Sequence, residues 1–191
     1  MNFIKTEIEG VYIIEPKVFG DNRGYFFESY NEKEFKKNGL DYTFVQDNES
    51  KSKKGVLRGL HFQKTYPQAK LVRVLEGEVF DVAVDLRRDS KTFGKWVGYE
   101  LTEENKKMLY IPPYFAHGFL VLSEEAEFAY KCDDVYNHAG EGGLKWNDPE
   151  VGIVWPEVPG MSKEDYLTSE KDGKWPTLSE LRNTDLFQNL K

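Results

Sequence analysis

The scarcity of histidine restricts the chemistry open to this chain. Only three histidines occur among its 191 residues: His61, His117 and His138. Two positions after His61 stands Gln63, so the two-residue His spacing of metal-binding β-barrels is absent. Two imidazoles far apart in the sequence, with a lysine nearby, make a poor zinc or iron site. We therefore expect no catalytic metal, which leaves His61 and His117 as lone imidazoles suited to accepting and donating protons near neutral pH.

Three further polar residues are expected on the inner faces of strands. Side chains alternate between the two faces of a strand, so residues two positions apart share a face. A polar residue that shares a face with apolar ones is therefore expected to be buried. A buried ammonium, carboxylate or phenol is costly unless it serves a pocket, so this phase predicts a polar pocket inside the fold. The residues and their same-face neighbours are Lys70 with Val72 and Val74, Asp81 with Val79 and Ala83, and Tyr130 with Phe128 and Cys132.

The elements that must position these residues are mostly short strands. The turn Glu76-Gly77-Glu78 predicts a hairpin that places the strands on either side of it next to each other in one sheet. Runs rich in β-branched and aromatic residues and bounded by turn residues predict strands over 11–15, 25–30, 43–48, 70–75, 79–86, 96–101, 107–111, 118–122 and 127–132. Such spacing indicates an all-β sandwich or barrel.

Two short helices are expected at the periphery of this β-structure. Asn31 can cap a helix over 32–37 that Gly39 ends. Pro176 can open a second helix through Leu181, within a C-terminal helical segment at about 176–191.

Composition sets further limits on the class of protein. A length of 191 residues suits one compact domain, expected to span 1–191. A hydrophobic fraction of 39% with 15% aromatic residues argues against disorder. The net charge of -7, with no block of Lys and Arg, predicts no basic surface that would bind nucleic acid or an acidic membrane. Cys132 is the single cysteine and residues 1–10 contain no apolar run, so we expect no intrachain disulfide, no export signal and a cytoplasmic protein.

Distinctive motifs occur in order over most of the chain, at 19–26, 46–48, 57–63, 68–73, 79–87, 116–119, 130–132, 146–149 and 169–172. This ordered set resembles the dTDP-4-dehydrorhamnose 3,5-epimerase family. The resemblance implies a jelly-roll, cupin-like fold without metal or other cofactor, usually a homodimer. It also implies a dTDP-sugar substrate, dTDP-4-dehydro-6-deoxy-D-glucose, epimerised at C3 and C5 on the route to dTDP-L-rhamnose.

The resemblance also implies the catalytic roles. Both C3–H and C5–H are α to the C4 ketone, so inversion needs a base, an enolate stabiliser and an acid. The family pattern makes His61 the base and Asp172 its partner, and it places Lys70 beside the C4 oxygen. Tyr130 corresponds to the acid that delivers a proton from the opposite face, and Asp81 is expected to keep Lys70 positioned and charged.

Further residues correspond to ligand contacts of the family. His117 matches a substrate-binding position, and Arg23 and Glu28 are expected to reach the pocket of a neighbouring subunit. Tyr114 departs from the pattern, because the family commonly has a Gly in this turn. The contacts implied for the nucleotide half are Arg23, Glu28, Gln46, Asp47, Asn48, Arg58, Glu141 and Lys171.

Three alternatives compete with the double epimerase. A monofunctional 3-epimerase of the same sugar would share the catalytic residues. A non-catalytic sugar-nucleotide-binding cupin would tolerate changes at His61 and Tyr130, which the complete set of base, acid and cation argues against. A metal-dependent cupin has only His61 and His117 to offer as ligands and ranks last.

Overall fold

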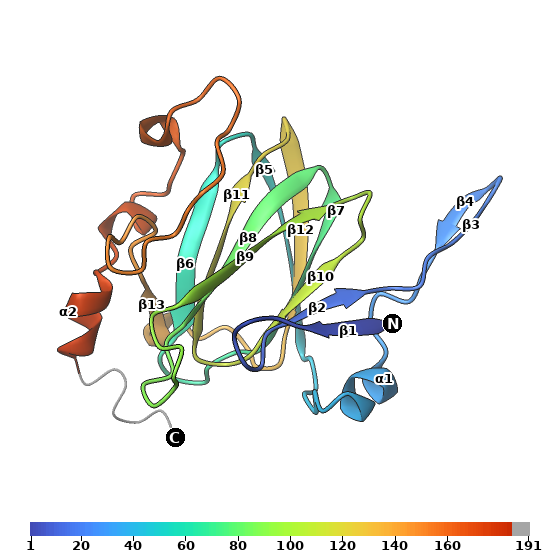
Figure 1. Ribbon diagram of the computed structural model, residues 1–191, viewed down its shortest axis with the longest axis horizontal. Coiled ribbons are helices and arrows are strands. Elements are labelled where there is room, and N and C mark those ends of the chain that lie inside the picture. Colours follow the sequence, from blue (N-terminus) through green and yellow to red (C-terminus); the bar gives the residue numbers. More distant parts are fainter. Residues whose placement is uncertain (185–191) are drawn as a thin grey trace.

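Two antiparallel sheets packed face to face form the body of the protein. The structure, a computed structural model, describes residues 1–184. The prediction of an all-β jelly roll is confirmed (Figure 1). The six-stranded sheet has the order β1 (Asn2–Lys5), β2 (Tyr12–Glu15), β10 (Met108–Ile111), β7 (Lys70–Glu76), β12 (Glu125–Cys132) and β5 (Gln46–Lys53). The five-stranded sheet has the order β13 (Glu141–Gly143), β6 (Leu57–Gln63), β11 (Phe115–Val121), β8 (Glu78–Asp85) and β9 (Trp96–Thr102).

The main core lies between the inner faces of the two sheets. Alternation along β8 places Val79 and Ala83 in this core and Val82 and Val84 in a second one on the outer face. The second core forms where the C-terminal segment crosses the outside of the five-stranded sheet, and Trp155 is buried there. Both faces of this sheet are therefore covered, which explains the near-continuous burial of β8 and β11.

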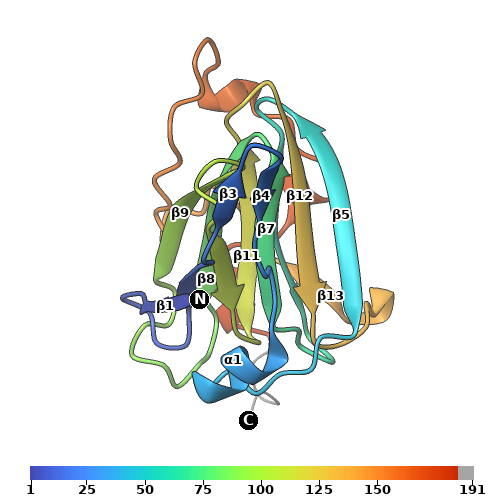
Figure 2. The ribbon, with the colours of Figure 1, turned by 90° about the vertical axis from the view of Figure 1, so that its right-hand side faces the viewer.

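The predicted hairpin around Gly77 is wrong. β7 pairs with β10 and β12, whereas β8 pairs with β11 and β9, so consecutive strands lie in different sheets (Figure 2). The turn at Gly77 has φ 79, and a Cβ there would lie 2.1 Å from the carbonyl oxygen of Glu125. Glycine thus lets the chain cross tightly between the sheets, a path that local turn signals do not distinguish from a hairpin.

Other strand boundaries also differ from the prediction. The strand expected at 43–48 is β5, Gln46–Lys53, and it continues through polar residues that alternate between exposed positions and half-buried or buried ones. The glycine-containing segment Leu57–Gln63, expected only to carry a motif, forms β6. Both strands gain their structure from pairing, β5 with β12 and β6 with β11 and β13.

The short helices lie at the edges of the sandwich. In α1 (Glu32–Lys37), Asn31 accepts the first free backbone N–H groups and Gly39 has φ 82, as predicted. The C-terminal helix α2 (Leu178–Arg182) begins two residues later than expected, because Thr177 rather than Pro176 caps it. The part of the predicted segment at 185–191 lies outside the described residues. None of the helices within 1–184 is long and apolar enough to cross a membrane. The described part of the chain also contains three 3-10 turns: η1 (His138–Gly140), η2 (Lys163–Asp165) and η3 (Asp172–Lys174).

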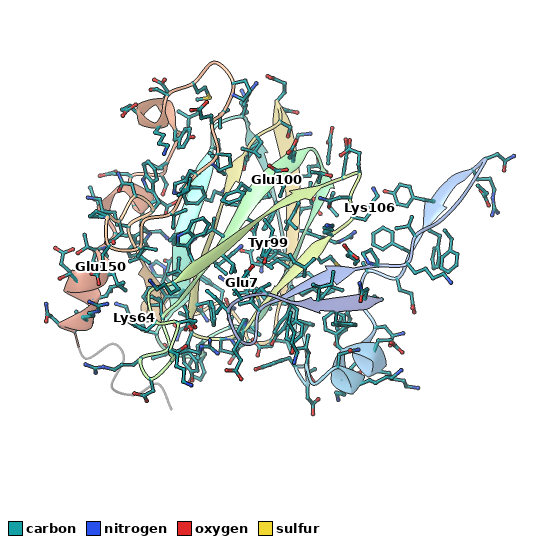
Figure 3. All side chains as sticks on the ribbon, in the orientation of Figure 1. Glu7, Lys64, Tyr99, Glu100, Lys106 and Glu150 are labelled. Atoms are coloured by element: carbon teal, nitrogen blue, oxygen red, sulfur yellow. The ribbon has the colours of Figure 1, made fainter. Side chains whose placement is uncertain are left out.

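A two-stranded ribbon projects from the body of the molecule. It consists of β3 (Phe19–Asp21) and β4 (Gly24–Phe26) and points away from both sheets (Figure 1). Phe19, Tyr25 and Phe26 are each more than half exposed on it. The ammonium of Lys106 lies 4.0 Å from the centre of the Tyr25 ring, which ties the ribbon to the loop after β9. Figure 3 shows Lys106 on the side of the body from which the ribbon projects.

Candidate active site

A polar cavity of ≈ 640 Å³ opens between the two sheets. The facing strands β6 and β11 of one sheet and β5, β7 and β12 of the other supply most of its wall. The cavity brings together most of the residues implied by the family resemblance: Gln46, Asp47, Asn48, Arg58, His61, Lys70, His117, Tyr130 and Glu141.

His61 and Asp172 form a hydrogen-bonded pair at one wall of the cavity. His61 Nε2 lies 2.6 Å from Asp172 Oδ1, although 111 residues separate them in the chain. Burial raises the pKa of Asp172, but bonds from His61, the Gly59 N–H and Trp175 outweigh it and leave the pKa below its ordinary value. The carboxylate is therefore ionised and accepts, so His61 Nε2 is the donor in this bond and Nδ1 is the ring nitrogen that faces other partners.

Three other groups hold this carboxylate in place. The backbone N–H of Gly59 donates to Asp172 Oδ2 (3.3 Å) and the indole Nε1 of Trp175 donates to Oδ1 (3.1 Å). The N–H of Asp172 itself donates to Ser169 Oγ (3.1 Å). Trp175 was not among the predicted site residues, and its position three residues after Asp172 was the one signal that could have pointed to it.

A close approach of β6 and β11 sets the position of His61. Gly59 has φ 126, and a Cβ there would lie 2.7 Å from the Cα of Gly118, so no other residue fits. The register of the two strands shifts between His117 and Phe119, and His61 faces His117 directly across the ladder. The two glycines thus bring the two histidines side by side in the cavity wall.

A second His–Asp pair lies deeper than the first. His117 Nε2 is 2.8 Å from Asp81 Oδ1, and both side chains are almost wholly buried. Burial lowers the pKa of His117, only partly offset by Asp81, and burial raises the pKa of Asp81. Burial favours the neutral forms of both groups, so this pair is poorly suited to gaining and losing a proton repeatedly. The half-exposed His61 is the more accessible of the two histidines.

Asp81, expected to keep Lys70 positioned and charged, acts on it through space and not through a direct contact. Asp81 bonds to His117, and Lys70 makes no ion pair within residues 1–184. Burial lowers the pKa of Lys70, while Cys132 and Asp81 favour its charged form through space. Phase correctly predicted that both side chains point inward, but Asp81 and Lys70 come from opposite sheets and the closer imidazole takes the bond.

Lys70 and Tyr130 face His61 from the other sheet. Lys70 lies on β7 and Tyr130 on the neighbouring β12, whereas His61 lies on β6 of the five-stranded sheet. Burial raises the pKa of Tyr130, with Arg58 acting in the opposite direction, so the phenol keeps its proton. An imidazole and a phenol therefore line the cavity from its two opposite walls, with the lysine on the same side as the phenol.

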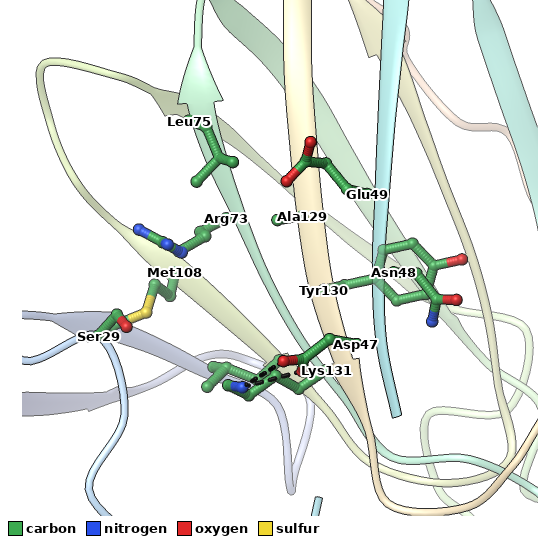
Figure 4. A pocket seen from close by; sticks show the side chains of 11 residues that line it. Ser29, Asp47, Asn48, Glu49, Arg73, Leu75, Met108, Ala129, Tyr130 and Lys131 are labelled. Carbon is green, nitrogen blue, oxygen red and sulfur yellow. Dashed lines mark hydrogen bonds and ion pairs between the residues drawn. The ribbon is translucent and has the colours of Figure 1, made fainter. Parts of the chain in front are cut away.

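The residues implied for the nucleotide half are divided between the cavity and its surroundings. Gln46 Nε2 donates to Asn48 Oδ1 (2.9 Å), and Arg58 Nε donates to Ser52 Oγ (3.0 Å). Asp47 alternates to the outer face, where Lys131 holds its carboxylate (2.9 and 3.1 Å), on the side of the sheet away from Tyr130 (Figure 4).

The rim of the cavity contains residues that sequence reasoning missed. Glu141 accepts bonds from Lys171 and from the hydroxyl of Tyr136, and Lys171 was expected here whereas Tyr136 was not. Buried Gln63 ties together the loops on either side of the mouth, because its amide bonds the carbonyl of Tyr66 (2.7 Å) and the N–H of Asn137 (2.7 Å). Gln63 therefore supports the loop that carries Tyr136.

Arg23 and Glu28 lie away from the cavity of their own chain. Arg23, on the projecting ribbon, pairs with Asp21, and Glu28 accepts a bond from Asn31. Tyr114, where the family commonly has Gly, has φ 70, which is a conformation that favours glycine. No group of three or more His, Cys, Asp or Glu side chains within the described part of the chain is arranged to hold a metal ion.

Comparison with known proteins identifies the family. A sequence model described as dTDP-4-dehydrorhamnose 3,5-epimerase matches residues 5–180. The chain belongs to this family. The dTDP-4-dehydrorhamnose 3,5-epimerase of Salmonella typhimurium is 58% identical over 169 residues, covering 86% of this chain and 92% of the relative.

Solved structures agree with this family assignment. The dTDP-6-deoxy-D-glucose-3,5-epimerase of Legionella pneumophila, in complex with dTDP-4-keto-L-rhamnose, is 49% identical, with a TM-score of 0.90 over 97% of this chain and 96% of that one. A 3'-monoepimerase from Streptomyces bikiniensis, in complex with dTDP-quinovose, is 32% identical, with a TM-score of 0.88 over 96% of this chain and 91% of that one. The fold is thus shared by double and single epimerases.

Proposed function

We propose that this protein is a dTDP-4-dehydrorhamnose 3,5-epimerase that converts dTDP-4-dehydro-6-deoxy-D-glucose to dTDP-4-dehydro-L-rhamnose, in the biosynthesis of dTDP-L-rhamnose. Family membership supports the substrate class and the type of reaction, an isomerisation. The observation that carries the mechanism is the placement of His61 and Tyr130 on opposite sheets across one cavity. Inversion at carbon requires removal of a proton from one face and its return on the other.

The catalytic cycle follows from the chemistry of the cavity. His61 Nδ1 removes the proton from a carbon next to the C4 ketone, and Asp172 stabilises the imidazolium that forms. The electron pair moves onto the C4 oxygen, where Lys70 stabilises the enolate in a site of low dielectric. Tyr130 then donates its phenolic proton to the opposite face of the same carbon. Proton exchange with solvent resets both groups before the second centre reacts.

The remaining cavity residues serve substrate binding. His117 bonds the sugar from its buried pair with Asp81, and Asn48, Gln46 and Arg58 hold the nucleotide half. Arginine suits a diphosphate because its planar fork donates paired, charge-assisted bonds. Glu141 and Lys171 close the rim, and Asp47 contributes at the edge of the cavity.

The assembly completes the site. Arg23 and Glu28 extend with the projecting ribbon to the cavity of a second copy, which makes the working unit a homodimer of single-domain chains, residues 1–191. The exposed aromatic side chains of the ribbon support this proposal, since exposed apolar surface of this kind favours a partner. The sugar nucleotide is a soluble metabolite, and the protein acts on it in the cytoplasm without a cofactor.

Solvent exchange tests the reaction directly. The protein, treated with chelator, is incubated in deuterated water with dTDP-4-dehydro-6-deoxy-D-glucose, and NMR follows deuterium into C3 and C5. Label at both carbons with an L-sugar product is the expected result. Label at C3 alone would identify a 3-epimerase, the alternative supported by the similar fold of the 3'-monoepimerase. No label at either carbon would contradict the epimerase assignment.

A further inference from the structure

One carboxylate oxygen in the candidate site accepts two ring donors. Trp175 Nε1 lies 3.1 Å from Asp172 Oδ1, and His61 Nε2 lies 2.6 Å from the same atom. Asp172 is only 3% exposed, so bulk water does not compete for this oxygen. An indole N–H can only donate, and its direction is fixed by the ring. The negative charge on Oδ1 is therefore divided between the imidazole and the indole.

The indole is held rigidly where it makes this bond. Trp175 follows η3, and the backbone N–H of Lys145 donates to the carbonyl of Pro176 (2.9 Å) just beyond it. Gly143, which faces His61 in the ladder of β13 and β6, packs against the ring: a Cβ there would lie 2.2 Å from an indole carbon. Lys171 lies over the ring, with Nζ 5.8 Å from its centre. The donor cannot swing away without disturbing these contacts.

We propose that Trp175 is a positioning residue for the epimerisation, whose indole N–H fixes the rotation of the Asp172 carboxylate and limits the negative charge that it presents to His61. This inference rests on the proposed function and adds a residue to it. An oxygen that accepts two hydrogen bonds binds each donor less strongly than one that accepts a single bond. Trp175 therefore restrains the attraction of Asp172 for the imidazolium, so that His61 loses its proton more readily and remains a free base to lower pH.

Other charged and titratable groups also face His61, and replacement of Trp175 removes none of them. Glu141 lies on β13, and His117 is directly opposite on β11. These groups are present in every variant at Trp175, so their electrostatic effect on His61 is common to the proteins being compared. The remaining groups around the cavity and the dyad are Arg58 on β6, Lys70 on β7, Asp81 on β8, Tyr130 on β12 and Lys171 beside η3.

The test is the pH profile of kcat/KM for Trp175→Phe, which keeps a ring and removes the donor. We expect the acid limb to move to higher pH by about 0.5 unit. Without the indole donor, Asp172 binds the imidazolium of His61 more strongly, by a fraction of a charge-assisted hydrogen bond. Above that limb kcat/KM should return to within about threefold of the parent value, because the base is then unprotonated in both proteins. In an Asp172→Asn background, Trp175→Phe should leave the acid limb where it is.

A matched control is Trp155→Phe. Trp155 donates its indole N–H to the carbonyl of Trp146 (2.9 Å), outside the candidate site, so its loss should lower stability and leave the limb in place. An acid limb for Trp175→Phe that coincides with that of the parent, with activity lowered equally at every pH, would overturn the inference. Turnover retained in His61→Ala would instead contradict the proposed function, so the two failures are distinguishable.

A measurement on the unaltered protein covers the case in which Trp175→Phe does not fold. The chain has four tryptophans, so the indole N–H resonance of Trp175 can be assigned by NMR. We expect this resonance to move with pH with the same midpoint as the acid limb. A resonance that does not respond through that pH range would show that the indole does not sense the His61–Asp172 pair, and the inference would fall.

Discussion

Replacement of Asp172 by Asn tests the role of the carboxylate beside His61. The change keeps the shape of the side chain and removes the charge that stabilises the imidazolium across a 2.6 Å bond. A hydrogen bond between charged partners contributes about 1.5–3 kcal/mol, and about 1.4 kcal/mol corresponds to a factor of ten in rate, so kcat should fall about 10- to 150-fold. The acid limb of the pH profile should move to lower pH, opposite to the direction expected for Trp175→Phe.

The assay is deuterium incorporation at C3 and C5 under saturating substrate, which measures the proton-transfer steps themselves. The control is Asp148→Asn, because Asp148 is as buried as Asp172, at 3% exposure, and accepts backbone N–H bonds from Glu150, Val151 and Leu178 outside the cavity. We expect the control to lose stability and keep its turnover. Equal turnover in Asp172→Asn and the parent would refute the assignment of Asp172 as the partner of the base.

Two further predictions follow from the same site. Tyr130→Phe should lower production of the L-sugar by about 100-fold or more, because loss of a general acid typically costs two to four powers of ten in rate. His61 should still catalyse proton exchange from its own face of the sugar. Incorporation of label with inversion at the parent rate would contradict this prediction. The pKa of Asp172 is depressed in the folded protein, so its contribution to stability is complete above the ordinary Asp value of about 3.9 and is lost as pH falls through the depressed value. Urea unfolding between neutral and acidic pH should therefore show a steeper acid loss of stability in the parent than in Asp172→Asn, and equal slopes would count against the linkage.

Local pattern was sufficient for much of the architecture. Short runs of β-branched and aromatic residues predicted most strands, because a strand buried on one or both faces needs those side chains at those positions. Alternation also predicted that Lys70, Asp81 and Tyr130 point inward, and all three do. It missed β6, whose glycine weakens the strand signal and is required by the close approach to Gly118.

The candidate site was partly predictable for a different reason. His61, Lys70 and Tyr130 lie in local motifs, so the family resemblance could assign them one by one. Arg23 lies away from the cavity of its own chain and pairs with Asp21, so its proposed role requires a second copy of the chain. In the sequence, Gln63 is notable only because a metal-binding β-barrel would have a histidine at this position. Its role in holding the loops at the mouth of the cavity depends on its contacts with the loops at 66 and 135–137.

By itself the sequence determined the elements, the faces on which their side chains lie and the chemistry available there, since these depend on neighbours within a few residues. Only the tertiary structure decided which elements became partners. β7 and β8 diverge into different sheets, Asp81 bonds His117 across adjacent strands rather than Lys70 across the cavity, and Trp175 shares an Asp172 oxygen with His61. Each of these pairings depends on packing between segments distant in the chain, where burial and geometry select one partner among several that local pattern allows.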